Sequence, residues 1–140
     1  KTFSVLEFAK THFIDNYFYV NLMINNELKE KLKNINDPKD IINILELHFQ
    51  KTINEQTLII FDEIQELKNI RTSFKFFYEE HKEIKIIGLG SYLSNALLND
   101  QEGFPVGKVD TINVYPLTFY EYVINANSLL ANKINNKKYL

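Results

Sequence analysis

Hydrophobic residues recur along this chain with two different periods, which predict an alternation of helices and strands. Apolar side chains three or four residues apart predict helices, and short aromatic, β-branched or continuous apolar runs predict strands. An Asp-Pro pair at 37–38 and a Thr-x-x-Glu capping box at 118–121 mark two helix starts. The predicted strands are 17–23, 58–61, 84–89 and 109–115, and the predicted helices are the opening segment to 13, a turn or two at 27–33, 37–49, 64–77, 92–98 and 118–130.

Helices that alternate with strands indicate crossover connections, and therefore an α/β fold with a mostly parallel sheet and helices on both faces. The run at 58–61, Leu-Ile-Ile-Phe, is apolar throughout, as expected of a strand that is buried on both faces. In such sheets, ligands bind beyond the carboxyl ends of the strands. The residues that directly follow each apolar run are therefore the candidates for chemistry.

Composition narrows the class of protein further. The chain has 140 residues, 45% hydrophobic and 24% charged, which fits one folded domain and argues against disorder. It contains no cysteine, so these residues form no disulfide, no cysteine-ligated zinc site and no thiol nucleophile. The net charge of −2 argues against a dedicated nucleic-acid-binding domain. The apolar runs are too short to cross a bilayer, which predicts no membrane partner and a cytoplasmic location.

Two carboxylates follow the apolar run at 58–61. Asp62 and Glu63 end this strand, where carboxylates are costly unless a cation or a reaction needs them. In P-loop ATPases, the Asp of such a pair helps to hold Mg²⁺ and the next Glu orients the attacking water. The pair is equally compatible with a cap on the following helix, whose first turn favours acids. Gln65 likewise has two interpretations, as a residue that orients water or as an exposed amide.

Two further positions fit the same chemistry. The chain opens with Lys1 and Thr2 before an amphipathic helix, as at the end of the phosphate loop G-x-x-x-x-G-K-[ST]. There Lys1 would contact the β- and γ-phosphates, and the Thr2 hydroxyl would bind Mg²⁺. Ser91, after Gly90, follows the apolar run at 84–89, where such ATPases place a sensor of the γ-phosphate, although Gly-Ser is also an ordinary turn. These features gain weight because they occur in the expected order.

Four stretches together carry a family resemblance: LIIFDEIQEL (58–67), FKFFYEEH (74–81), IIGLGSYLSNALL (86–98) and FPVGKVDTINVYPLTFYEYV (104–123). On these stretches the chain resembles the prokaryotic AAA-type P-loop ATPases that carry a separate, often nuclease-like, C-terminal domain. The resemblance implies a three-layer P-loop NTPase-like fold that binds ATP and hydrolyses it with Mg²⁺, driving a conformational change in a partner or C-terminal domain. It implies Asp62 and Glu63 as catalytic residues, Lys1, Thr2, Ser91 and Lys108 as nucleotide-binding residues, and Thr2 and Asp62 as Mg²⁺ ligands.

The resemblance also implies that residues 1–140 are a partial AAA-type domain. The chain starts at the Lys-Thr of the phosphate loop, without the strand and glycine-rich loop before it and without the C-terminal domain. Residues 1–140 alone are therefore expected to bind ATP weakly or not at all, because the amides of that loop cradle the phosphates. The strand expected at 109–115 would lack one neighbour, so either the chain is an excerpt of a longer protein or this strand docks elsewhere.

The sequence leaves several alternatives open for the role of Lys108, for the binding partners and for the activity. Lys108 approaches the nucleotide, acts as a finger from a neighbouring subunit, or is a surface lysine. Relatives of this class often assemble into rings, so a homo-oligomer is one implied partner, and an unknown protein or nucleic acid bound by the missing domain is another. A second hypothesis, from a different class of function, is a nucleotide-dependent switch or interaction module that seldom hydrolyses ATP. A comparison of ATP turnover with ATP binding would distinguish this switch from an ATPase.

Overall fold

The structure is a computed structural model that describes residues 1–91 and 107–126. The chain divides into two compact units, Lys1–Asp110 and Thr111–Leu140. The first unit contains all three strands of the described residues, and the second contains α6 (Phe119–Ala126). The helix expected at 92–98 and the end of the last expected helix lie outside the described residues.

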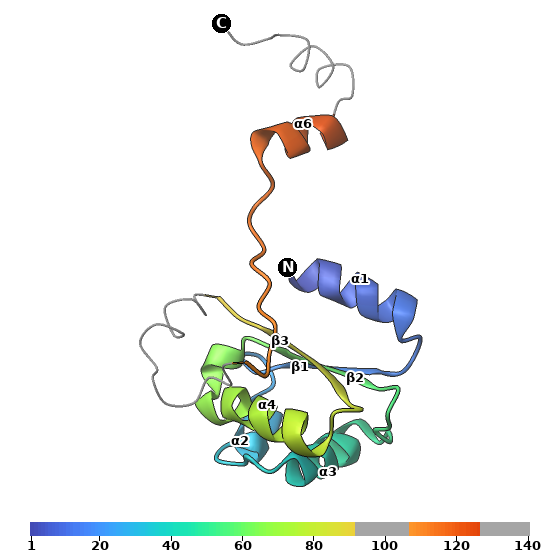
Figure 1. The fold of residues 1–140 in the computed structure, drawn as a ribbon, viewed down its shortest axis with the longest axis vertical. Coiled ribbons are helices and arrows are strands. Elements are labelled where there is room, and N and C mark those ends of the chain that lie inside the picture. The colour runs from blue at the N-terminus through green and yellow to red at the C-terminus, as the bar shows by residue number, and fades with distance from the viewer. Residues whose placement is uncertain (92–106, 127–140) are drawn as a thin grey trace, which may run out of the picture. The chain divides into compact units, whose positions relative to one another are not determined.

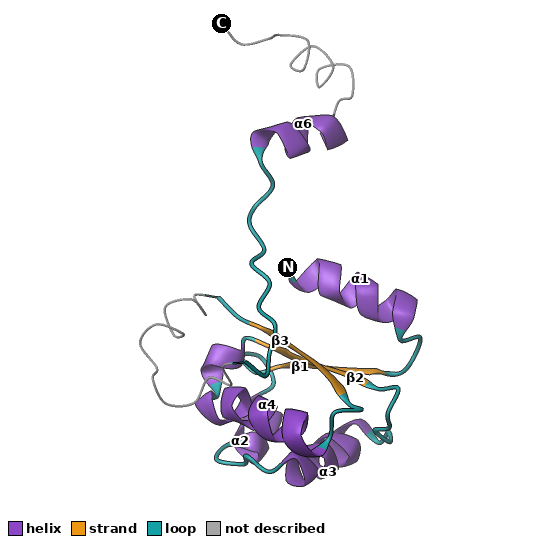
Figure 2. Cartoon of the chain, viewed as in Figure 1, coloured by secondary structure: helices purple, strands orange, loops and turns teal. Residues whose placement is uncertain are grey.

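A three-stranded parallel sheet forms the centre of the first unit (Figure 2). Its order is β1 (Tyr17–Asn21), β2 (Leu58–Asp62) and β3 (Lys85–Leu89), and β2 is buried at all five positions. Asn21, Asp62 and Leu89 lie in one row across the sheet, because they are aligned in the parallel register. The carboxyl ends of the three strands therefore form one edge, and the expected α/β fold with a parallel sheet is confirmed.

Helices cover both faces of this sheet (Figure 1). One face carries α1 (Thr2–His12). The other face carries α2 (Asn26–Leu32), α3 (Pro38–Phe49), the short 3-10 helix η1 (Ile64–Glu66) and α4 (Lys68–Glu80).

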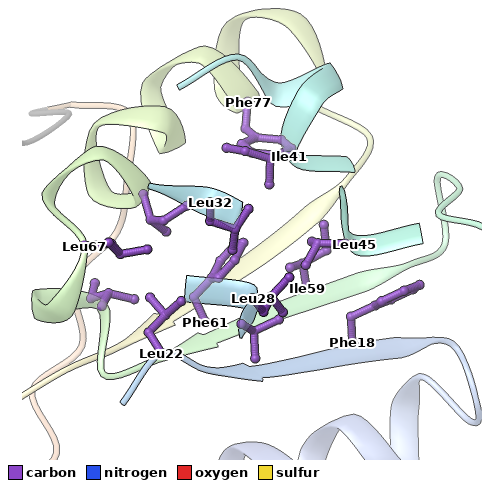
Figure 3. Packing of buried hydrophobic residues seen from close by; sticks show 13 residues of the cluster. Phe18, Leu22, Leu28, Leu32, Ile41, Leu45, Ile59, Phe61, Leu67 and Phe77 are labelled. Carbon is purple, nitrogen blue, oxygen red and sulfur yellow. The ribbon is translucent and has the colours of Figure 1, made fainter. Parts of the chain in front are cut away.

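The alternation of side chains along β2 separates two hydrophobic clusters. Ile59 and Phe61 pack into the larger cluster, between the sheet and α2, α3 and α4 (Figure 3). Leu58 and Ile60 pack on the opposite side, against Ala9 of α1. Because successive strand residues point to opposite faces, position 62 falls on the α1 side of the sheet.

Most predicted elements are present, and two helix starts confirm their sequence signals. Asp37 precedes α3 and its side chain accepts a hydrogen bond from the Lys39 amide, 2.8 Å away. The capping box also forms, since the Glu121 amide donates to Thr118 Oγ1 at 3.2 Å and the Glu121 carboxylate accepts from the Thr118 amide at 2.7 Å. The hydrogen bonds that the Glu121 carboxylate accepts from the Thr118 amide and the Thr118 hydroxyl lower the pKa of Glu121.

The prediction of a strand at 109–115 is wrong. Residues 109–115 have no regular secondary structure, and Ile112 and Tyr115 are 85% and 78% exposed. A strand is held by hydrogen bonds to a neighbouring strand, and no strand of the described residues pairs with this segment. Alternation of apolar and polar residues predicts which side chains share a face, but it does not supply that neighbour.

Gly88 lies where β3 packs closely against side chains of α4 and η1. A Cβ atom at this position would lie 2.8 Å from Cε2 of Phe74 and 3.0 Å from Cδ1 of Ile64. Ile64 belongs to the large cluster and the partly buried Phe74 packs against it, so a shift of either side chain requires repacking. We expect Gly88→Ala to lower the free energy of unfolding by about 1–3 kcal/mol, as overpacking does.

Urea denaturation of the wild type and of Gly88→Ala measures this change. The double variant Gly88→Ala with Phe74→Leu should recover part of the loss, because the smaller side chain leaves room for the new methyl group. Equal stability of Gly88→Ala and the wild type would show that the Phe74 ring shifts at no cost.

Candidate functional site

Asp62 ends the central strand and is only 2% exposed. Its Oδ2 atom accepts hydrogen bonds from the Thr2 hydroxyl at 3.0 Å and from the Tyr19 hydroxyl at 2.8 Å. Its Oδ1 atom accepts from the backbone amide of Glu63 at 2.9 Å. Three neutral donors from three segments of the chain thus fix both oxygens of a buried carboxylate, which is costly to bury without such partners.

Glu63 directly precedes the 3-10 helix η1, but, contrary to the alternative interpretation, the Asp62 and Glu63 side chains do not cap the following α-helix. The Glu63 side chain makes no capping hydrogen bond to η1, and the next α-helix, α4, begins only at Lys68. The residue before α4 is Leu67, in an extended conformation. The predicted helix at 64–77 therefore starts later than expected, and the two acids occupy a separate turn at the strand end.

Glu63 adopts a left-handed backbone conformation, with φ 56° and ψ 47°. This conformation costs a non-glycine residue about 1 kcal/mol or more, and such strain is concentrated at functional sites. The turn leaves the Glu63 carboxylate half-buried, where it accepts a hydrogen bond from the Gln65 side chain. Gln65 is itself exposed, so it holds the Glu63 carboxylate at the surface of the site.

The other predicted residues at the sheet edge are exposed. Lys1 directly precedes α1, whose first residue is the Thr2 that binds Asp62. Ser91 comes two residues after the end of β3, the strand beside β2, and its side chain is exposed. The structure therefore brings Thr2, Asp62 and Glu63 together, with Lys1 and Ser91 at the same edge of the sheet.

Lys108 lies elsewhere in the first unit. Its ammonium group pairs with the carboxylate of Glu79 and lies 5.6 Å from the centre of the Tyr78 ring. Glu79 is near the end of α4, which starts after β2 and leads back to the start of β3. Lys108 is therefore held toward the amino edge of the sheet, and the structure does not bring it together with Asp62.

This geometry can be compared with known proteins. A family model described as "AAA domain" matches residues 1–123. The chain belongs to the AAA domain family. Membership assigns this AAA domain to the nucleotide-binding proteins of ATPase type and agrees with its α/β, P-loop NTPase-like fold. Neither the curated proteins nor the solved structures gave a match.

The side chains around Asp62 in this AAA domain fit a Mg²⁺ ion. Mg²⁺ is usually bound through one or two carboxylates together with water and substrate phosphates, whereas all-protein cages suit other metals. Asp62 offers one carboxylate, and Thr2 offers one hydroxyl oxygen 3.0 Å from it. Across residues 1–91 and 107–126, no three His, Cys, Asp or Glu side chains are placed to hold a metal.

Two residues of the site were not predicted from the sequence. Tyr19 is half-buried and donates to Asp62, and the Asn21 side-chain amide lies 3.4 Å from the Tyr19 hydroxyl. Burial raises the pKa of Tyr19, and the Asp62 carboxylate raises it further, whereas the hydrogen bond from Asn21 acts in the opposite direction. The sequence signal that could have indicated these two residues is a pair of polar groups two positions apart on a strand rich in aromatic and β-branched residues. Two such residues lie on the same face of the strand.

None of the helices in the described part of this AAA domain combines the length and the apolar character that a bilayer crossing requires.

Proposed function

We propose that this AAA domain binds Mg-ATP at the carboxyl edge of its sheet and hydrolyses it, and that turnover drives a change in a partner or a C-terminal domain. One observation carries the proposal: Thr2 Oγ1 lies 3.0 Å from Asp62 Oδ2, although the two residues are 60 positions apart. Lys-Thr before a helix and Asp-Glu after a buried strand are both features of P-loop ATPases, and each is weak by itself. Their contact joins them into one site.

The phosphates would lie at the start of α1. We place Lys1 and Thr2 as the last two residues of a phosphate loop, at the N-terminal end of this helix. The unpaired amides and the positive end of a helix dipole favour anions there. The exposed ammonium group of Lys1 would contact the β- and γ-phosphates.

Thr2 and Asp62 would hold the Mg²⁺ ion. The Thr2 hydroxyl donates its proton to Asp62, which leaves lone pairs of its oxygen for a metal. Asp62 is fixed as an acceptor by the three donors described above, so its orientation is set before any ligand arrives. The metal held by Thr2 and Asp62 would supply positive charge against the negative charge that develops on the phosphates.

Glu63 would orient the attacking water and accept its proton. The water oxygen attacks the γ-phosphorus, the bond from that phosphorus to the ADP oxygen breaks, and the water proton passes to the Glu63 carboxylate. The hydrogen bond from Gln65 holds this carboxylate in place. Ser91, at the end of the neighbouring strand, would donate its hydroxyl to the γ-phosphate, whereas Lys108 is engaged by Glu79 and is left out of this site.

A Mg-ATP titration of the full-length protein tests the proposal. We expect Asp62→Ala to weaken Mg-ATP binding by about tenfold or more, because direct metal ligands contribute at least as much as the residues that support them. Asp40→Ala removes an exposed aspartate in the first turn of α3 and should leave binding unchanged.

Asp62→Asn serves as a second variant, since it preserves the shape of the buried side chain while it removes the charge and replaces one acceptor oxygen with an NH2 donor. Weaker binding in both Asp62 variants, with melting temperatures near that of the wild type, would support the site. Absence of Mg-ATP binding by the wild-type protein would mean that the fold has the ATPase pattern without its ligand, and the search would turn to protein partners.

A further inference from the structure

We infer that Tyr19 is a positioning residue for the Mg²⁺ site, and that Asn21 fixes the direction of its hydrogen bond. The inference rests on the proposed function, because it concerns how Asp62 is held for the metal. The Tyr19 hydroxyl lies 2.8 Å from Asp62 Oδ2, the same oxygen that accepts from Thr2.

The place of Tyr19 follows from the parallel register of β1 and β2. Tyr19 lies opposite Ile60, so Asp62 is its diagonal neighbour on the α1 face, two residues further along β2. The 2.8 Å hydrogen bond shows that the Tyr19 side chain is long enough to reach across this diagonal. Tyr19 therefore spans from the neighbouring strand to the end of β2.

The side chain of Asn21 determines the direction of the Tyr19 hydroxyl proton. Its Oδ1 atom accepts from the backbone amides of Met23 at 3.0 Å and Ile24 at 3.1 Å. Those two donors fix the amide orientation, so the Nδ2 group must be the atom that lies 3.4 Å from the Tyr19 hydroxyl. The Tyr19 oxygen accepts from Asn21, and its own proton is thereby directed at Asp62.

This chain of bonds connects the turn after β1 to the carboxylate that would hold the metal. Residues that orient a metal ligand without touching the metal typically change metal affinity by ~10- to 100-fold when they are removed. Without the Tyr19 hydroxyl, Asp62 Oδ2 retains only Thr2 as a donor, and Thr2 must also serve the metal. Loss of Tyr19 should therefore weaken the response to Mg²⁺ more than it weakens the fold.

The substitution Tyr19→Phe removes only the hydroxyl group, and Tyr17→Phe is its matched control. Tyr17 lies on the same strand and the same face, also half-buried and packed toward α1, but two residues further from the site. ATP turnover of the full-length protein is measured against Mg²⁺ concentration for both variants and the wild type. Nucleotide binding in EDTA and the melting temperature are measured alongside.

We expect Tyr19→Phe to raise the half-saturating Mg²⁺ concentration by about tenfold, with turnover restored by excess Mg²⁺ and nucleotide binding in EDTA unchanged. Tyr17→Phe should follow the wild-type curve. A wild-type Mg²⁺ curve for Tyr19→Phe would overturn the inference, and so would a lower melting temperature with no shift along the Mg²⁺ axis. A wild-type protein without Mg²⁺-dependent turnover would instead overturn the proposed function, and this inference with it.

Discussion

Glu63→Gln in the full-length protein is expected to bind Mg-ATP as the wild type does and to lose turnover by about 100-fold or more. Glutamine has the size of glutamate and retains an oxygen that orients water, but it cannot accept the water proton at neutral pH. Glu63 is half-buried beside Asp62. Its backbone amide donates to the Asp62 carboxylate, whereas its side chain does not contribute to that set of hydrogen bonds. The substitution should therefore leave the Mg²⁺ site intact and remove only the base.

Binding of a fluorescent ATP analogue and release of phosphate measure the two effects separately. Glu66→Gln is the matched control, because Glu66 lies in the same turn but pairs with Lys29 at 2.6 Å. A surface ion pair of this kind contributes little, so turnover of Glu66→Gln should equal that of the wild type. Normal turnover in Glu63→Gln would remove Glu63 from its role.

The wild-type arm of this experiment also distinguishes the two classes of function. Tight nucleotide binding with negligible wild-type hydrolysis, together with a partner affinity that depends on the nucleotide, would favour a switch over an ATPase. Hydrolysis that depends on Glu63 would favour the ATPase.

The periodicity of the sequence predicted β1, β2, β3 and the helices between them, because burial on one or two faces leaves a local pattern. The segment at 109–115 shows where this approach fails. Its alternation is as regular as that of a strand, but Ile112 and Tyr115 are exposed and no described strand pairs with it. A strand depends on a neighbour that is distant in sequence, and a local pattern contains no information about that neighbour.

The candidate site, too, could be predicted only in part from the sequence. Thr2, Asp62 and Glu63 were predictable because each lies at the end of an element or directly beside one. Such positions are brought together at the carboxyl edge of a parallel sheet. Tyr19 was not predictable, since its contact with Asp62 requires β1 to be adjacent to β2 in one particular register. The left-handed backbone of Glu63 also left no signal, because glutamate is not a residue that favours positive φ.

Phe61→Ala should have the largest effect on stability among the substitutions considered for the sheet. Phe61 is fully buried on the central strand and packs among residues of α2, α3 and α4 (Figure 3). Its ring centre lies 6.2 Å from that of Phe74. Truncation of such a phenylalanine costs about 3–5 kcal/mol through lost burial and the cavity that remains. That is a large share of the ~5–15 kcal/mol by which domains are stable.

Urea denaturation and melting temperature measure the loss, and Phe3→Ala is the matched control. Phe3 is 77% exposed on α1, so its truncation should change the free energy of unfolding by less than about 0.5 kcal/mol. If Phe61→Ala does not fold, Phe61→Leu keeps the measurement possible, because it leaves a smaller cavity and should cost less. Equal effects of Phe61→Ala and Phe3→Ala would contradict the packing described for β2, since only Phe61 should leave a cavity in the core that positions Asp62.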